Sequence, residues 1–230
     1  MEVSAKMIVE GIEKVGDILK SSKKVGDFVA QVFGPLLEDS IGLVSDRLKY
    51  FRAEKLALLH QKTQKKLQES GITETVPVPP KVGIPLIENA SLEEDDDLHT
   101  KWSNMLSNAM NPNNHQTITK IYVSILSEVN PLDIHILDKI YDTLLSKELI
   151  YPIENLHKHR LTKENLINVL RISIEDYYIS ADNLMRSQLI KPAILKDTGI
   201  AAGSEPITIY KDVDIITLSP LGAKLVEACK

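Results

Sequence analysis

The chain has 230 residues, which is enough to bury the core of one large domain or of two small ones. A hydrophobic share of 43% excludes a wholly disordered chain, and a net charge of −5 argues against a protein built mainly to coat nucleic acid. A single cysteine, Cys229, excludes an internal disulfide and fits a reducing compartment. Because no apolar run reaches the roughly 18 residues of a membrane-spanning helix and no signal-peptide pattern is present, we expect a cytoplasmic protein.

The first 33 residues carry apolar side chains every three or four positions, which is the period of a helix. An interruption at Ser21 and Ser22 predicts two helices rather than one. Glycines at positions 11, 16 and 26 weaken these helices but let them pack closely. We interpret the segment as bundle helices, and a membrane-active amphipathic role is the alternative.

A second helical pattern follows Gly34–Pro35 and ends at Gly71, a residue type that suits a helix C-terminus. It predicts one long helix over residues 36–70, about 50 Å in length at 1.5 Å per residue. One face of this helix is basic and carries Arg47, Lys49, Arg52, Lys55, Lys62, Lys65 and Lys66. This basic face is a candidate surface for nucleic acid or anionic lipid, and the alternative is a solvated helix face.

A proline-rich linker over residues 73–85 comes next, and we expect a short helix from Leu86 to Ala90 after it. Ser91 is the predicted N-cap of the following helix, with Glu94 completing a capping box. The acidic run 93–97 would then lie in the first turn, where the helix dipole favours negative charge.

The acidic run has two alternative interpretations. It could bind a hard metal ion together with His99, or it could dock against the basic face of the long helix. The metal is disfavoured because adjacent carboxylates on a helix point to different sides. The helix after the run carries Trp102 and Leu106 on one face, where Trp102 is expected to fill the core. That helix ends at Pro112, and a further helix is predicted over residues 117–128.

From residue 131 onward the pattern is mixed. Helices are predicted over residues 131–146, over 163–170 with Thr162 as cap, and from a cap at Ser173 to residue 188. Strand-like runs follow at 189–195, 207–210 and 213–218, and Ser219–Pro220 opens a last helix. Three helices, a β-hairpin and a final helix resemble a winged-helix domain.

A winged helix suggests DNA binding through its third helix. Here that helix holds Glu175, Asp176 and Asp182 against Arg186 alone, and the predicted wing over 196–214 has two lysines and four acids. Because duplex DNA requires phosphate neutralisation, we interpret the domain as one used for packing or protein contact.

No catalytic constellation is visible in the sequence. His157 and His159 are the only histidines close together, and no Cys or further His spacing completes a zinc site. Glycine-rich phosphate loops and a nucleophile elbow are absent, and Cys229 fits a buried structural thiol. We therefore expect no enzyme, no metal and no cofactor. An unrecognised enzyme is the alternative, because catalytic groups can converge from distant positions.

Three segments together resemble the Abi-alpha family of bacterial abortive-infection proteins: FGPLLEDSIGLVSDRLKYFRAEKLALL, VPPKVGIPLIENASLEEDDDLHTKWSNMLSNAMNP, and VNPLDIHIL leading to TLSPLGAKLVEAC. The similarity extends from about Phe33 to the C-terminus. Its most specific part is the central segment, with Pro80, Lys81, Ser91, Trp102 and Leu106, which we interpret as structural. The resemblance implies a role in anti-phage defence and supplies no catalytic residue.

These observations predict a mainly α protein with a small β-hairpin, in three regions. They are a helical region with the long basic helix (1–75), a linker with central helices (76–130) and a winged-helix-like α+β domain (131–230). We expect a non-catalytic protein that binds a host or phage protein during abortive infection. The alternatives are a nucleic-acid effector using the basic face and a membrane-active effector using the N-terminal helices. Exposed apolar helix faces also make a homo-oligomer a candidate.

Overall fold

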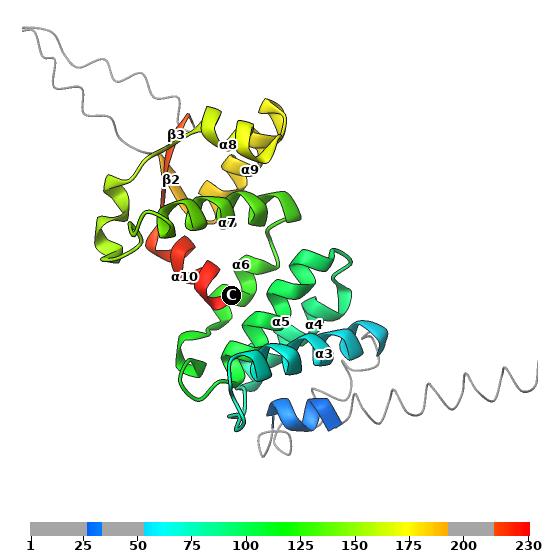
Figure 1. Cartoon of the computed structure of the whole chain (residues 1–230). Coiled ribbons are helices and arrows are strands. Elements are labelled where there is room, and N and C mark those ends of the chain that lie inside the picture. The colour runs from blue at the N-terminus through cyan, green and yellow to red at the C-terminus, as the bar shows by residue number, and fades with distance from the viewer. Residues whose placement is uncertain (1–26, 34–52, 193–213) are drawn as a thin grey trace, which may run out of the picture. The chain divides into compact units, whose positions relative to one another are not determined.

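The computed structural model describes residues 27–33, 53–192 and 214–230 of the chain (Figure 1). It divides into two compact units, Met1–Ser127 together with Ala228–Lys230, and Glu128–Glu227. The three regions expected from the sequence remain a prediction.

The first unit is helical throughout its described part. Residues 27–33 form a helix, followed by α3 (Ala53–Glu69), α4 (Pro80–Leu92), α5 (Asp96–Met110), the 3-10 helix η1 (His115–Thr117) and α6 (Lys120–Leu126). α3 packs against both α4 and α5 (Figure 1). Its buried side chains recur at helical spacing, as Leu56, Leu59, Thr63 and Leu67.

The helix over residues 27–33 is tied into this core. Phe28 and Phe33 are buried, and the backbone amide of Val78 donates to the carbonyl of Val32 at 2.8 Å. Gly83 of α4 makes room for one of these rings, because a Cβ at this position would lie 2.7 Å from Cε1 of Phe33. The apolar side chains of this helix are therefore buried in the core of the first unit.

The predicted long helix is confirmed only in its second half. α3 ends at Glu69, and Gly71 follows with a positive φ of 67°, a conformation that glycine adopts without strain. Residues 36–52, and the first of the two helices predicted over residues 1–33, lie outside the described residues. The second of those helices is confirmed over residues 27–33. The helix predicted over 117–128 is shorter, since α6 covers only Lys120–Leu126 and η1 precedes it.

Two predictions about the central segment are wrong. The helix expected from Leu86 to Ala90 is longer, because Pro80 occupies the first helical position, where a missing amide proton costs nothing. Ser91 is not an N-cap: it lies in the last turn of α4, buried, with its Oγ donating to the carbonyl of Glu88 at 2.7 Å. Asp95 caps α5 instead.

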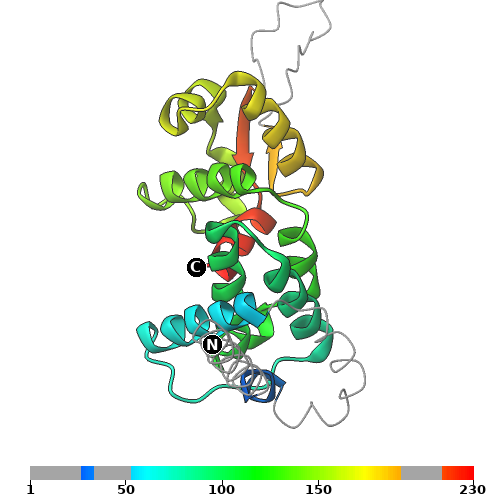
Figure 2. The ribbon, with the colours of Figure 1, turned by 90° about the vertical axis from the view of Figure 1, so that its right-hand side faces the viewer.

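The second unit combines helices with a small sheet. In chain order it contains α7 (Pro131–Leu145), the 3-10 helix η2 (Ile153–Lys158), β1 (Leu161–Thr162), α8 (Lys163–Leu170), α9 (Ile174–Arg186), β2 (Ile190–Pro192), β3 (Ile215–Leu218) and α10 (Pro220–Ala228). The strands are antiparallel in the order β1-β3-β2, with Leu161 opposite Ile216 and Lys191 opposite Thr217. β2 and β3 are seen side by side in Figure 2.

The helix starts of this unit agree with the sequence signals. Thr162 and Ser173 accept hydrogen bonds from the amides of Asn165 and Asp176, as expected of N-caps. Ser219 Oγ accepts from the amide of Gly222 at 2.9 Å at the start of α10. The mainly helical class with a small antiparallel sheet is thus confirmed. The sheet has a third strand, β1, which the sequence did not predict because it is only two residues long.

The strand predicted at 207–210 lies outside the described residues. Among the residues that the structure describes, no helix combines the length and the apolar character needed to cross a membrane.

Candidate functional site

The basic face of the long helix is the main candidate site, and the structure describes its second half. Arg47, Lys49 and Arg52 lie outside the described residues. Lys62 of α3 donates from Nζ to Asp96 Oδ1 at 2.7 Å, to the Asp96 carbonyl at 3.2 Å and to Thr100 Oγ1 at 2.8 Å. One lysine of the basic face is therefore held by the start of α5.

Lys55 makes a second, looser contact of the same kind, with its Nζ 3.6 Å from Glu94 Oε2. The side chains of Lys55 and Lys62 are only 12% and 20% exposed. Docking of the acidic run against the basic face, one of the alternatives for this run, is what the structure shows. We call Lys55, Lys62, Glu94, Asp96 and His99 the α3–α5 junction.

Two lysines of the basic face remain outside this junction. Lys65 is 75% exposed and lies 3.8 Å from Glu69, one helical turn further on. Lys66, in the last turn of α3, is half-buried. The described part of the basic face thus presents less positive charge to solvent than the sequence suggests.

The electrostatics of the junction follow from these contacts. The hydrogen bond from Lys62 holds the pKa of the Asp96 carboxyl below its usual value, so Asp96 is charged at neutral pH. His99 is fully buried, and its Nε2 lies 3.3 Å from the Lys55 carbonyl. A carbonyl only accepts, so Nε2 carries the proton, while the buried Nδ1 has no hydrogen-bond partner. Burial lowers the pKa of His99.

The acidic run has structural roles that explain its composition. Asp95 accepts from the amide of Leu98 at 2.9 Å as N-cap, and Glu93 accepts from the amide of Asp95 at 3.0 Å. With Glu94 and Asp96 at the junction, four consecutive carboxylates start α5 and fasten it to α3. Among the described residues, no three His, Cys, Asp or Glu side chains are grouped to hold a metal.

The residues of the family-like central segment have structural positions. Pro80 is the first residue of α4 and Lys81 is exposed beside it. Trp102 and Leu106 are 1% and 0% exposed in α5. These residues and Ser91 therefore lie at the first turn of α4, in the buried face of α5 and in the last turn of α4.

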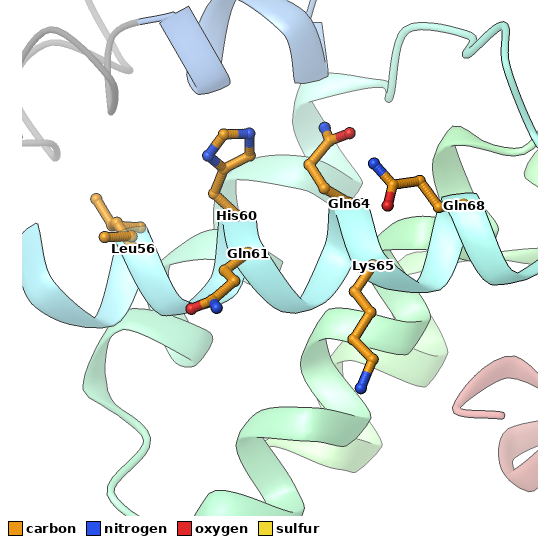
Figure 3. A pocket seen from close by; sticks show the side chains of 7 residues that line it. Leu56, His60, Gln61, Gln64, Lys65 and Gln68 are labelled. Carbon is orange, nitrogen blue, oxygen red and sulfur yellow. The ribbon is translucent and has the colours of Figure 1, made fainter.

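A hollow of about 640 Å³ lies along α3 and is lined by Leu56, Ala57, His60, Gln61, Gln64, Lys65 and Gln68. Figure 3 shows His60 and Gln64 pointing toward the helix over residues 27–33, and Lys65 pointing the opposite way. Gln64 Nε2 donates to Gln31 Oε1 at 2.9 Å, and the His60 ring lies 4.8 Å from that of Phe28. The polar groups of the lining are three amides, one imidazole and one ammonium group, and none of the seven lining residues has a hydroxyl, thiol or carboxylate side chain.

A polar cluster in the second unit was not expected from the sequence. Glu227 of α10 accepts from Tyr141 of α7 and from Tyr151, and it pairs with Lys224 at 2.7 Å. Burial and the neighbouring carboxylate raise the pKa of Tyr141 to about 12, so its hydroxyl stays protonated and donates. The cluster joins three segments that are far apart in the sequence.

Two amides of α5 were also missed by sequence reasoning. Asn104 and Asn108, one turn apart, donate from Nδ2 to the carbonyls of Cys229 and Ala228, each at 3.0 Å. Their spacing of four was the only available signal, and nothing local identifies a partner more than 100 positions away. Cys229 itself is buried, as expected for a structural thiol.

The outward face of α9 is a second surface that emerges from the structure. Tyr177, Ser180, Ala181 and Leu184 are buried. The opposite side carries Glu175, Ile179, Asp182 and Arg186, at successive spacings of four, three and four. Ile179 is 60% exposed between the two carboxylates. Arg186, the one cation of this helix, pairs with Glu128 at 2.9 Å and donates to the side-chain Oδ1 of Asn183 at 2.8 Å.

The family model for Abortive infection alpha matches residues 52–229, well over half of the chain. The chain belongs to this family. The match confirms the resemblance carried by the central and C-terminal segments, whereas residues 33–51 precede it. Membership in the Abortive infection alpha family implies a role in defence against phage. No curated protein and no solved structure matches the chain.

Proposed function

We propose that this Abortive infection alpha protein is a non-catalytic binding protein, which acts in the bacterial cytoplasm by contacting another protein of the host or of the phage. Family membership supplies the defence role. The mode of action is argued below from the charges and contacts of the described residues.

The pairing of Lys55 and Lys62 with the acidic run carries the proposal. A nucleic-acid groove needs cations that can exchange their counterions for phosphates. Lys62 is instead committed to Asp96 and Thr100, and Lys55 lies against Glu94, inside the same unit. Moving Lys62 to a phosphate would break three hydrogen bonds and leave Asp96 uncompensated at the start of α5.

The topology of the second unit supports a winged-helix-like domain. α7, β1, α8, α9, β2, β3 and α10 follow in the order typical of that fold, and β3 lies between β1 and β2. The predicted wing over residues 196–214 lies, except for Asp214, outside the described residues. In a DNA-binding winged helix the helix equivalent to α9 enters the major groove. The carboxylates Glu175 and Asp182 on its outward face would oppose phosphates, so this face favours a protein partner.

The described side chains also favour binding over catalysis. His99 is buried with one ring nitrogen unpartnered, and His157 Nδ1 donates to the Glu154 carbonyl at 2.7 Å. Neither histidine is placed beside a nucleophilic side chain by these contacts. Lys163, whose pKa is raised by Asp214 and Tyr178, holds the start of β3 against α8 and α9.

Nucleic-acid binding is the second candidate function, and the exposure of Lys65 is the observation that favours it. It would require Lys65 and Lys66 to act together with Arg47, Lys49 and Arg52. The membrane-active alternative gains no support from residues 27–33, whose apolar side chains are buried in the first unit.

Two experiments test the proposal. Deleting the gene should raise phage yield for at least part of a broad phage panel, and an unchanged yield across the panel would remove the defence role. Purified full-length protein should show no salt-dependent binding to duplex DNA, single-stranded DNA or RNA. Binding that is tight at low salt and lost in the Lys65→Glu, Lys66→Glu variant would replace the proposal with the nucleic-acid candidate.

A further inference from the structure

The exposed apolar side chains of the second unit are concentrated around α9. The described residues contain seven large apolar side chains that are exposed, and Val169, Ile174 and Ile179 are three of them, within eleven positions. Val169 lies in the last turn of α8 and the other two lie on α9. Ile174 and Ile179 are five positions apart on α9, which is about 140° around the helix axis, so they lie on different sides of the helix. Ile179 is the exposed apolar residue of the outward face of α9 described above.

We propose that the surface formed by Glu175, Ile179 and Asp182 docks a cationic amphipathic helix of a partner protein. We call it the α9 surface. This inference rests on the proposed function, since it names the partner chemistry for the protein contact proposed above.

The charge of the α9 surface selects the partner. Ile179 is flanked on its own face by Glu175 four positions before and Asp182 three positions after. Arg186, the next residue along this face, is paired with Glu128 and does not neutralise them. A partner with an apolar side chain between two Lys or Arg residues would match this order, with the isoleucine supplying burial and the carboxylates supplying orientation and rate of encounter.

The surface is also built on a rigid support. Ser173 Oγ caps α9 and donates to Asp176 Oδ2 at 2.8 Å, so Asp176 is used within the helix start. At the other end Asn183 Nδ2 donates to the buried carboxylate of Asp133, which belongs to the capping box of α7. α9 is therefore fixed at both ends, and docking would require no rearrangement of its backbone.

Full-length protein provides a direct test with two synthetic peptides as probes. One is an amphipathic helix of leucine and lysine, and the other has the same pattern with glutamate in place of lysine. We expect the lysine peptide to bind and the glutamate peptide not to bind. Ile179→Asn should weaken binding about tenfold, whereas Ile179→Leu, which keeps the apolar volume, should preserve it.

Charge variants give an independent readout. Glu175→Gln combined with Asp182→Asn should weaken binding at about 50 mM salt and flatten its salt dependence, because the rate of encounter is electrostatic. Glu74→Gln combined with Glu148→Gln, two exposed acids outside the α9 surface, is the matched control and should behave as wild type. Ile121→Asn, at an isoleucine of the first unit that is 55% exposed, is the matched apolar control.

Equal binding by wild type and Ile179→Asn would overturn the α9 surface as the docking site. A wild-type dimer that Ile179→Asn converts to a monomer in light scattering would identify a second copy as the occupant and would also overturn the cationic-partner assignment. Neither result would affect the proposed function, which fails separately if the protein binds nucleic acid through the basic face.

Discussion

Lys62 in the middle of α3 and Asp96 at the first position of α5 are joined by a contact of 2.7 Å between Nζ and Oδ1. The lysine side chain is 20% exposed and the aspartate 81% exposed, so the pair lies at the edge of the core. It brings together the two most strongly charged stretches of the first unit. Charges that could each have bound an external ligand instead fasten one helix to another.

The Lys62–Asp96 pair should couple energetically. A double-mutant cycle with Lys62→Gln and Asp96→Asn is expected to give about 0.5–1 kcal/mol in the free energy of unfolding, because the geometry is close and Lys62 is half-buried. Lys65 and Glu69, 3.8 Å apart on the surface of α3, are the matched control and should give less, about 0.3–0.5 kcal/mol.

Urea denaturation followed by Trp102 fluorescence measures this coupling, since Trp102 is the only tryptophan and lies in α5. Salt at about 1 M should reduce both coupling energies. A Lys62–Asp96 coupling no larger than that of the control pair would show that the junction does not hold the two helices together.

His99 should make stability depend on pH. Burial lowers its pKa in the folded chain below the ordinary value of 6.5, whereas the unfolded chain keeps the ordinary value. As pH falls below about 6.5, the unfolded state binds a proton that the folded state does not, so the free energy of unfolding falls. The slope is at most about 1.4 kcal/mol per pH unit until the folded pKa is reached.

His99→Gln should remove this component of the slope between pH 6.5 and 5, measured by urea denaturation at several pH values. If His99→Gln keeps the wild-type slope, His99 is not the group that links folding to protonation.

The sequence predicted Ser91 as the N-cap of the helix that follows the acidic run, whereas the structure shows Asp95 in that position. Asp95→Ala should lower the free energy of unfolding by about 1 kcal/mol, because the amide of Leu98 loses its acceptor. Ser91→Ala removes only a donor to a carbonyl within α4, so we expect a smaller cost. Urea denaturation of the two variants measures both losses in the free energy of unfolding. A larger loss for Ser91→Ala than for Asp95→Ala would support Ser91 as the N-cap of α5.

Gly222→Ala should destabilise the second unit although it adds a better helix former. A Cβ at this position would lie 2.2 Å from the carbonyl oxygen of Leu189. That oxygen accepts from the amide of Ser219 at 3.0 Å, so it cannot move away without loss. We expect a loss of about 1–3 kcal/mol, typical of overpacking.

At a helix position without such a close contact, replacing glycine by alanine would instead raise the free energy of unfolding by about 1 kcal/mol. The sign of the change in the thermal midpoint therefore tests how closely Gly222 of α10 approaches the Leu189 carbonyl, just before β2. Lys224→Ala, on an exposed position of the same helix, is the matched substitution and should cost less. A higher midpoint for Gly222→Ala would show that this approach is looser than described.

Local signals in the sequence predicted the second unit well. Thr162, Ser173 and Ser219 each accept a hydrogen bond from the amide three positions later, so neighbouring residues are enough to predict their role as caps. β1 was missed because two residues are too few to show the alternation of a strand. Its pairing with β3 depends on residues more than 50 positions away.

The α3–α5 junction illustrates why site prediction is harder than element prediction. Seven cations on one helix face and five acids in one run each suggested an external ligand, and docking between them was one alternative among three. To choose among these three interpretations, one must know that α3 packs against α5 near Lys62. No local pattern in the sequence indicates this packing. The same holds for Ser91, since several acidic and polar residues near position 95 could each cap a helix.

The outward face of α9 could be anticipated in part. Its acidic balance is visible in the sequence, and it motivated the expectation of a protein contact. The exposure of Ile174 and Ile179 could not be anticipated, because helical isoleucines are usually buried and the inward face is fixed only by packing around Tyr177 and Leu184.

The measurement that tests the central claim most directly is binding of the purified full-length protein to duplex DNA, single-stranded DNA and RNA at about 50 and 200 mM salt. Lys55 and Lys62 contact the acidic residues at the start of α5. We therefore predict that the protein shows no salt-dependent binding to nucleic acid, even at low salt. Tight, salt-dependent binding that is lost in the Lys65→Glu, Lys66→Glu variant would contradict the proposal and make the basic face the functional site.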